Sequence, residues 1–142
     1  MTNPEEPDAN RDADPDVIVV QGDVDLATML GYALETAAVA TRVYTDGASA
    51  LEDILALPRL NKVRLLLLGV DLPGIGGHSI HERVTAERPR EFVVAFISAR
   101  ENEAEELRAL GTGAIDYLAR PVSIAVLRAK VRNWISLLRA EG

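Results

Sequence analysis

The sequence contains no cysteine, which excludes disulfide bonds, zinc–thiolate centres and thiol catalysis. Aromatic residues make up only 4% of the chain, and its longest apolar run falls far short of the roughly 20 residues that span a bilayer. An excess of basic residues is absent too, since the net charge is −7, and this argues against direct binding of nucleic acid. The N-terminus is acidic rather than basic, so no targeting segment is predicted and we expect a cytoplasmic protein with no membrane contact.

Most of the negative charge lies in the first 16 residues. The stretch "MTNPEEPDANRDADPD" holds six acidic residues against Arg11, together with three prolines and almost nothing to bury. Such a composition predicts a disordered acidic tail over residues 1–16. The rest of the 142 residues, 17–142, is long enough for one domain that buries a core without a covalent or metal staple.

From Val17 onward, short apolar runs alternate with amphipathic stretches. The pattern predicts strands at about 17–20, 41–44, 65–68, 92–97 and 115–118, each followed by a helix. Asp25 is expected to cap the first of these helices. Five successive strand–helix units predict an α/β protein, in which right-handed crossovers place helices on both faces of one parallel sheet.

The site of such a sheet forms where its strands end, at their carboxyl edge. The residues that the sequence delivers there are Gln21, Gly22 and Asp23 after the first strand, Gly69 and Asp71 after the third, Ser98 after the fourth, and Tyr117, Arg120 and Pro121 in or just past the fifth.

Three stretches, "LLLLGVDLPGIGG", "FISAR" and "GAIDYLARP", resemble the receiver domain of response regulators in two-component signalling. The resemblance extends over about residues 17–139. It implies a flavodoxin-like, doubly wound (βα)5 fold with strand order 2-1-3-4-5 and a role in phosphorelay signal transduction.

Receivers carry two acidic residues after strand one that hold Mg²⁺, an aspartate after strand three that accepts the phosphoryl group, and a lysine before the proline after strand five. Here the acceptor position is Gly69, the acidic pair is Gln21 and Gly22, and the lysine position is Arg120. A glycine has no oxygen with which to form an acyl phosphate, and a hard cation needs oxygen ligands. The resemblance therefore predicts a degenerate, non-enzymatic pseudo-receiver with no metal and no cofactor.

Two other functions remain open. Displaced acids, Asp71 as acceptor and Asp23 as metal ligand, could serve a phosphorelay if the turn at 72–74 slid by two residues. A flavodoxin-like binder of a small ligand would need a phosphate loop after strand one, where Asp23 and Asp25 repel phosphate instead.

The matching positions are expected to persist as a vestigial site. Ser98 should bond backbone or water, Tyr117 should be a fixed ring, and a cis peptide bond should precede Pro121. Because an unpaired charge is costly to desolvate, Arg120 should pair with Asp71 or Asp23 or lie in solvent.

The chain also contains two histidines, His78 and His81, near the start of the third helix. They are three residues apart and lack a third ligand nearby. We therefore expect both to be solvated.

The last helix carries the strongest interaction signal. Its core stripe is Ile124, Leu127, Val131, Trp134, Ile135 and Leu138. Val126 and Leu137 fall just outside the stripe and extend apolar character toward solvent beside Trp134, as in an interface. In receivers the face made by helix four, strand five and helix five binds partners or a second copy. The predicted function is therefore phosphorylation-independent protein interaction or dimerisation through that face.

Overall fold

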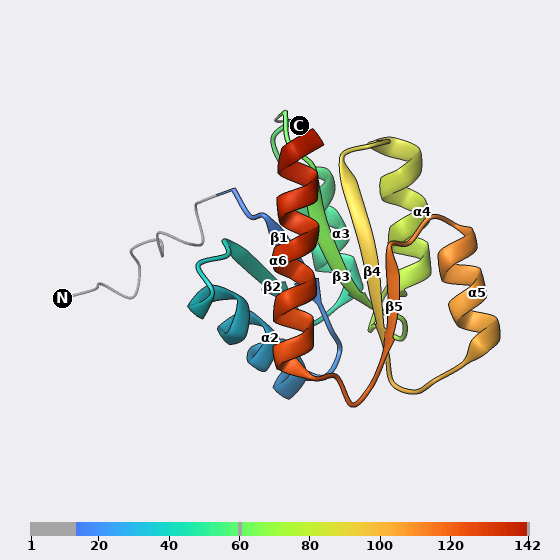
Figure 1. Ribbon diagram of the computed structural model, residues 1–142. Coiled ribbons are helices and arrows are strands. Elements are labelled where there is room, and N and C mark those ends of the chain that lie inside the picture. The colour runs from blue at the N-terminus through green and yellow to red at the C-terminus, as the bar shows by residue number, and fades with distance from the viewer. Residues whose placement is uncertain (1–13, 60, 142) are drawn as a thin grey trace, which may run out of the picture.

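The computed structural model describes residues 14–59 and 61–141, and its centre is a parallel sheet of five strands in the order β2-β1-β3-β4-β5 (Figure 1). The strands are β1 (Val17–Val20), β2 (Thr41–Tyr44), β3 (Arg64–Gly69), β4 (Phe92–Ser98) and β5 (Asp116–Ala119). The described helices are α2 (Val24–Thr36), α3 (Gly47–Leu55), α4 (Gly77–Glu87), α5 (Glu103–Gly111) and α6 (Ile124–Glu141). The flavodoxin-like fold predicted from the sequence is confirmed, including its strand order. No helix in the described ranges is both long and apolar enough to cross a membrane.

Successive residues of each strand point to opposite faces of the sheet, and this alternation divides the core in two. Ile18, Leu66 and Phe96 face α3, α4 and α5. Val19 and Leu67 face α2 and α6. Strands covered on both faces become continuous apolar runs, as in the fully buried β3.

The start of α2 differs from the prediction, since its N-cap is Asp23 and not Asp25. The Asp23 side chain accepts a hydrogen bond from the backbone N–H of Leu26 at 3.1 Å. Asp25 instead lies within the first turn, where a carboxylate also suits the positive end of the helix dipole. Three residues, Gln21, Gly22 and Asp23, therefore separate β1 from α2.

Residues 1–13 of the predicted acidic tail lie outside the described residues. The last residues of that stretch, Asp14 and Asp16, belong to the ordered domain. Asp14 contacts Arg64, and Asp16 contacts Lys62 and, at 3.0 Å, Arg139 of α6. Asp14 and Asp16 therefore contact residues of the predicted domain, and the boundary after residue 16 stays a prediction.

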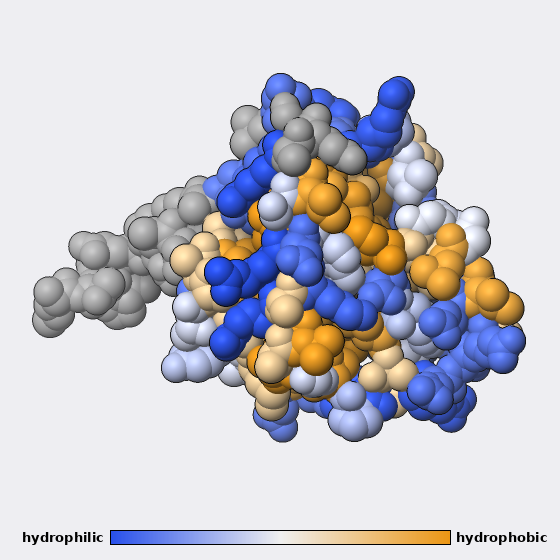
Figure 2. Space-filling view, in the orientation of Figure 1, coloured by the Kyte–Doolittle hydropathy of each residue, from blue (hydrophilic) through white to orange (hydrophobic). Residues whose placement is uncertain are grey.

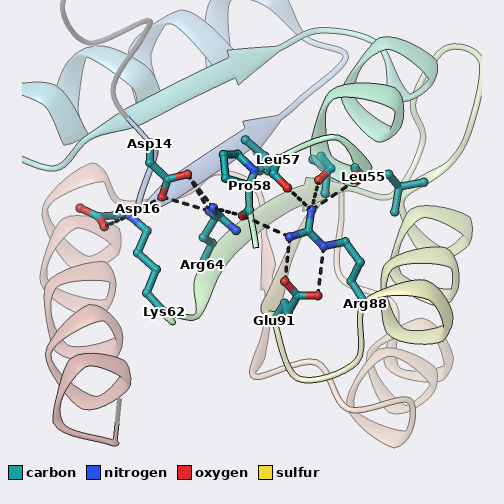
Figure 3. A network of polar contacts seen from close by, with 10 residues as sticks. Asp14, Asp16, Leu55, Leu57, Pro58, Lys62, Arg64, Arg88 and Glu91 are labelled. Atoms are coloured by element: carbon teal, nitrogen blue, oxygen red, sulfur yellow. Dashed lines mark hydrogen bonds and ion pairs between the residues drawn. The ribbon is translucent and has the colours of Figure 1, made fainter. Parts of the chain in front are cut away.

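Two fully buried arginines tie the amino edge of the sheet together (Figure 3). The guanidinium of Arg64 donates to Asp14 at 2.6 Å and to the carbonyl of Pro58 at 2.8 Å. Lys62 lies 2.5 Å from the same Asp14 carboxylate. Although burial raises it, hydrogen bonds from Arg64 and Lys62 bring the net pKa of Asp14 below its usual range.

Arg88 closes the carboxyl end of α3. It donates to the carbonyls of Ile54 at 3.0 Å and Leu57 at 2.8 Å, and it forms a two-pronged pair with Glu91 at 2.7 and 3.0 Å. These bonds from Arg88 lower the pKa of Glu91. Helix ends leave carbonyls without partners, so a buried guanidinium that satisfies several of them joins α3, α4 and the start of β4.

Candidate functional site

The strands bring the sequence-predicted site residues to one edge of the sheet. Gly69 is the last residue of β3 and pairs in register with Ile97 of β4. Gln21 follows Val20 of β1, which is in register with Leu68 of β3. Ser98 ends β4 opposite Ala119 of β5. Gln21, Gly69 and Ser98 therefore end three neighbouring strands.

At Gly69 little space is left for a side chain. A Cβ built on this residue would lie 3.0 Å from Cδ2 of Leu72 and 3.1 Å from Oε1 of Gln21. Gln21 is 4% exposed, so its carboxamide is held in the interior against the end of β3. A side chain at this position would require the ends of Leu72 and Gln21 to move slightly.

The loop after β3 packs tightly because α4 begins against it. A Cβ on Gly77, the first residue of α4, would come within 2.0 Å of the carbonyl oxygen of Gly69. The Gly77 N–H donates to the carbonyl of Val70 at 3.0 Å. This close approach, which only glycine permits, fixes Gly69 as the end of the strand.

The two displaced acids, Asp71 and Asp23, lie outside the strands. Asp71 is exposed, two residues beyond the end of β3. Asp23 caps α2 and pairs with Arg120 at 2.7 Å, each side chain being 38% exposed. The Leu26 N–H and the Arg120 guanidinium together lower the pKa of Asp23. Of the three outcomes considered for Arg120, the structure shows the pair with Asp23, which joins the ends of β1 and β5.

The residues at this edge do not fit Mg²⁺. Gln21 and Gly22 bring no carboxylate to the end of β1, and the Asp23 carboxylate already accepts from Leu26 and Arg120. Within residues 14–59 and 61–141, no three His, Cys, Asp or Glu side chains cluster closely enough to hold a metal ion. No chemical step through a metal is therefore derived for this chain.

Ser98 at the end of β4 and Tyr117 in β5 both form hydrogen bonds within the chain. The Ser98 hydroxyl donates to the backbone carbonyl of Arg100 at 3.0 Å, so it bonds its own chain. The peptide bond between Arg120 and Pro121 is cis. The Tyr117 ring is buried, with 6% of the residue exposed, and its hydroxyl donates to Oε2 of Glu105 at 3.1 Å. Burial and the Glu105 carboxylate raise the pKa of Tyr117, against a smaller lowering by Ser98.

The expectation that both histidines are solvated is wrong. His81 is 7% exposed and packs edge-on to Phe96, and burial together with the charge of His78 lowers its pKa. The His78 ring lies 4.6 Å from the Phe96 ring, with its Nε2 3.6 Å from Oε1 of Glu105. Sequence reasoning did not identify Glu105. The signal available was its place three residues after the capping Asn102, which fixes it in the first turn of α5.

The predicted interface residues lie on α6, with different exposure. Val126 and Leu137 are 54% and 62% exposed, whereas Trp134 is half-buried against the core. The neighbouring elements add exposed apolar residues that the sequence analysis did not single out, namely Leu107 and Leu110 of α5 and Ile115 before β5. Figure 2 shows hydrophobic side chains over α6 and over α5 on the face turned to the viewer. The structure thus presents separate apolar groups along the α5–β5–α6 face.

The chain is similar in sequence to proteins of one family. The family model described as response regulator receiver domain matches residues 17–132. The chain is 31% identical to the phosphate regulon transcriptional regulatory protein PhoB of Rhizobium meliloti, covering 89% of this chain and 55% of that protein. It is 32% identical to the transcriptional regulatory protein PrrA of Mycobacterium tuberculosis, covering 90% and 52%. The chain therefore spans about half the length of these curated relatives.

Solved structures show the same fold. The receiver domain of the Francisella response regulator 1452 superposes with a TM-score of 0.75 at 24% identity, covering 87% of this chain and 98% of that one. The receiver domain of NtrX from Brucella abortus gives 0.73 at 25% identity, covering 85% and 98%. Together with the family match over residues 17–132, these findings establish that the chain belongs to the response regulator receiver domain family.

Proposed function

We propose that this domain is a degenerate receiver, which transmits a signal through protein–protein contact and not through aspartyl phosphate. The observation that carries the proposal is the absence of a carboxylate at Gly69, a position with little room for a side chain. A glycine stands where the acceptor carboxylate is expected, and Leu72 and Gln21 lie within 3.1 Å of the position that a Cβ would take. The proposal includes the absence of enzymatic activity, metal and cofactor, and a cytoplasmic location.

The contacts of Tyr117 support the proposal that the domain does not depend on phosphorylation. Its ring is buried, and its hydroxyl is held by Glu105 of α5. Ser98, the residue that would contact a phosphoryl group, is bonded to the Arg100 carbonyl instead. The switch positions therefore have partners within the domain.

The α5–β5–α6 face is the proposed contact surface. Leu107 on α5 and Val126 and Leu137 on α6 are each more than half exposed. Exposed apolar side chains on the elements of one face are a feature of protein interfaces. Its occupant is a second copy of this domain or a protein partner, and no direct contact with nucleic acid is proposed.

The decisive experiment is intact-mass measurement after incubation with Mg²⁺ and acetyl phosphate, with a receiver that carries the acceptor aspartate as positive control. We expect no species heavier by one phosphoryl group. Labelling of this chain would overturn the proposal and would favour the displaced-acid phosphorelay. Asp71→Asn and Asp23→Asn would then identify the acceptor.

Sedimentation of the wild-type domain over a range of concentrations tests the face. We expect self-association that Leu107→Glu abolishes. Met29→Glu is the matched control, because Met29 is similarly exposed but lies on α2, outside the α5–β5–α6 face. Equal loss of association in both variants would contradict the assignment of the face.

A further inference from the structure

Three polar side chains from three elements meet on the side of the sheet that carries α4 and α5. His78 comes from α4, Glu105 from the first turn of α5, and Tyr117 from β5. The two oxygens of the Glu105 carboxylate face different partners. Oε2 accepts from the Tyr117 hydroxyl at 3.1 Å, and Oε1 lies 3.6 Å from Nε2 of His78. Glu105 therefore connects the histidine to the tyrosine.

His78 lies close to Glu105 but forms no hydrogen bond with it. The ring is 12% exposed and lies against Phe96, while its Nε2 is buried and has no hydrogen-bond partner. A separation of 3.6 Å exceeds the range of a hydrogen bond between nitrogen and oxygen. A buried polar atom without a partner, aimed at a carboxylate, is an arrangement that protonation would change.

We propose that His78 is a proton-responsive residue that controls, through Glu105, the position of Tyr117 and of the first turn of α5. In the imidazolium form both ring nitrogens donate, so Nε2–H faces the Glu105 carboxylate whichever tautomer the neutral ring adopts. A charge-assisted N–H···O bond has a length of about 2.7–2.9 Å, so protonation draws the two groups together. Histidine is the side chain that ordinarily changes charge between about pH 5 and pH 8.

The cluster has three other ionisable neighbours, which are His81, Glu82 and Glu106. His81, on the same helix, has its pKa lowered by burial and by the charge of His78. Glu82 of α4 is exposed and acts on His81. From α5, Glu106 is exposed and acts on Tyr117, whose own pKa is raised. The contribution of β4 is the uncharged ring of Phe96.

Protonation of His78 would also affect the proposed contact face, because Glu105 and Leu107 lie on the same helix. The backbone N–H of Glu105 donates to Asn102, so the side chain is anchored to a well-capped helix start. The exposed Leu107 lies two residues further along the same helix. Fixing Glu105 fixes this turn, and an ordered surface associates at a lower entropic cost. This part rests on the proposed function, since it supplies the face with a control that does not require phosphate.

The first test follows ring resonances of histidine and tyrosine by NMR in the same pH titration. In the wild type we expect Tyr117 to shift with the midpoint of His78. His78→Gln should remove the Tyr117 shift, and Glu105→Gln should remove it while His78 still titrates. His81→Gln is the control and should leave the coupling intact. A Tyr117 signal that ignores the titration of His78, or that still shifts in His78→Gln, would overturn the proposal.

The second test measures self-association at about pH 6 and pH 8, two values inside the range in which histidine ordinarily titrates. We expect several-fold tighter association at the lower pH in the wild type, and no difference in His78→Gln. A domain that stays monomeric while Tyr117 follows His78 would contradict the proposed dimer and support the histidine control. Association that is equal at both values, with Tyr117 independent of His78, would overturn the histidine control and leave the proposed function standing.

Discussion

The two ends of the sheet in this domain are held by opposite kinds of contact. At the amino edge, Arg64 and Arg88 are fully buried and bind Asp14, Glu91 and several backbone carbonyls (Figure 3). At the carboxyl edge, Gly69 is packed against neutral groups, and the pair between Arg120 and Asp23 is 38% exposed on each side.

The difference separates what stabilises the fold from what a phosphoacceptor needs. Carboxylates clustered without a cation repel one another and raise each other's pKa values, so a functional acidic site is a burden on stability. Because Gln21, Gly22 and Gly69 are uncharged, they add no such repulsion at the carboxyl edge. The buried guanidiniums of the amino edge are paired with Asp14 and Glu91, and they join segments that are distant in the sequence.

The largest effect should come from breaking the amino edge at Arg88. Arg88→Met leaves the carbonyls of Ile54 and Leu57 without their buried donor and leaves Glu91 with only the exposed Arg59, and we expect a loss of about 3–5 kcal/mol in the free energy of unfolding. Urea denaturation measures it. Arg83→Met is the matched control on the same helix, because Arg83 forms an exposed pair with Glu87 worth at most about 1 kcal/mol. Similar losses in the two variants would contradict the comparison.

Removal of the Asp14 charge should have the next largest effect. Asp14→Asn leaves the buried Arg64 without a full counter-charge, and a destabilisation of about 2–3 kcal/mol is expected. Glu35→Gln, an exposed change on α2, should cost almost nothing. If Asp14→Asn proved as mild as this control, residue 14 would not belong to the folded domain.

The same edge should determine the response to acid. The pKa values of Asp14 and Glu91 are lowered in the fold, so their stabilisation is present above their unfolded-state values of about 4 and is lost as the pH falls through the folded-state values. Urea midpoints measured from neutral pH downward should fall steeply below about pH 4. In Asp14→Asn this fall should be shallower. An unchanged slope would assign the acid sensitivity to other carboxylates.

At the carboxyl edge, Gly69→Ala should cost about 1 kcal/mol, because the new Cβ presses on the movable ends of Leu72 and Gln21. Gly111→Ala, where a Cβ would have no neighbour within 4 Å, should be neutral or slightly stabilising. Denaturation curves of both variants give the contrast. A neutral Gly69→Ala would mean that the space at this position is more open than the geometry indicates.

The smallest effect is expected for Arg120→Gln. An ion pair with both partners 38% exposed contributes about 0.2–1 kcal/mol and is screened by salt. The difference from the wild type should shrink further in high salt. A loss comparable with that of Arg88→Met would show that the carboxyl edge is also held by charge.

The alternation of apolar runs and amphipathic stretches was sufficient to predict the five strand–helix units and the carboxyl edge as the site. A strand such as Leu65–Leu68 is recognisable because covering both faces requires a continuous apolar run. The burial of His78 was not predicted, because its neighbours come from distant parts of the chain. Nothing local in "GHSIHERV" indicates that its ring will stack on Phe96, 18 residues away, and face Glu105 of another helix.

The ion pair between Asp14 and Arg64 at the amino edge could not be predicted from local sequence either. Asp14 was grouped with the acidic tail because its neighbours in the sequence are polar, yet its partner Arg64 is 50 residues further along. A charged residue inside an apolar strand run indicates a buried pair, but not which carboxylate completes it.

The sequence alone determined the order of elements, the strands that are buried on both faces, and the absence of carboxylates at positions 21, 22 and 69. These follow from side-chain chemistry and from spacing along the chain. Only the tertiary structure decided that Leu72 and Gln21 lie close to Gly69, that Arg120 forms an ion pair with Asp23, and that Glu105 lies between His78 and Tyr117. Those outcomes depend on distances between segments far apart in the chain, which packing determines and local propensity does not.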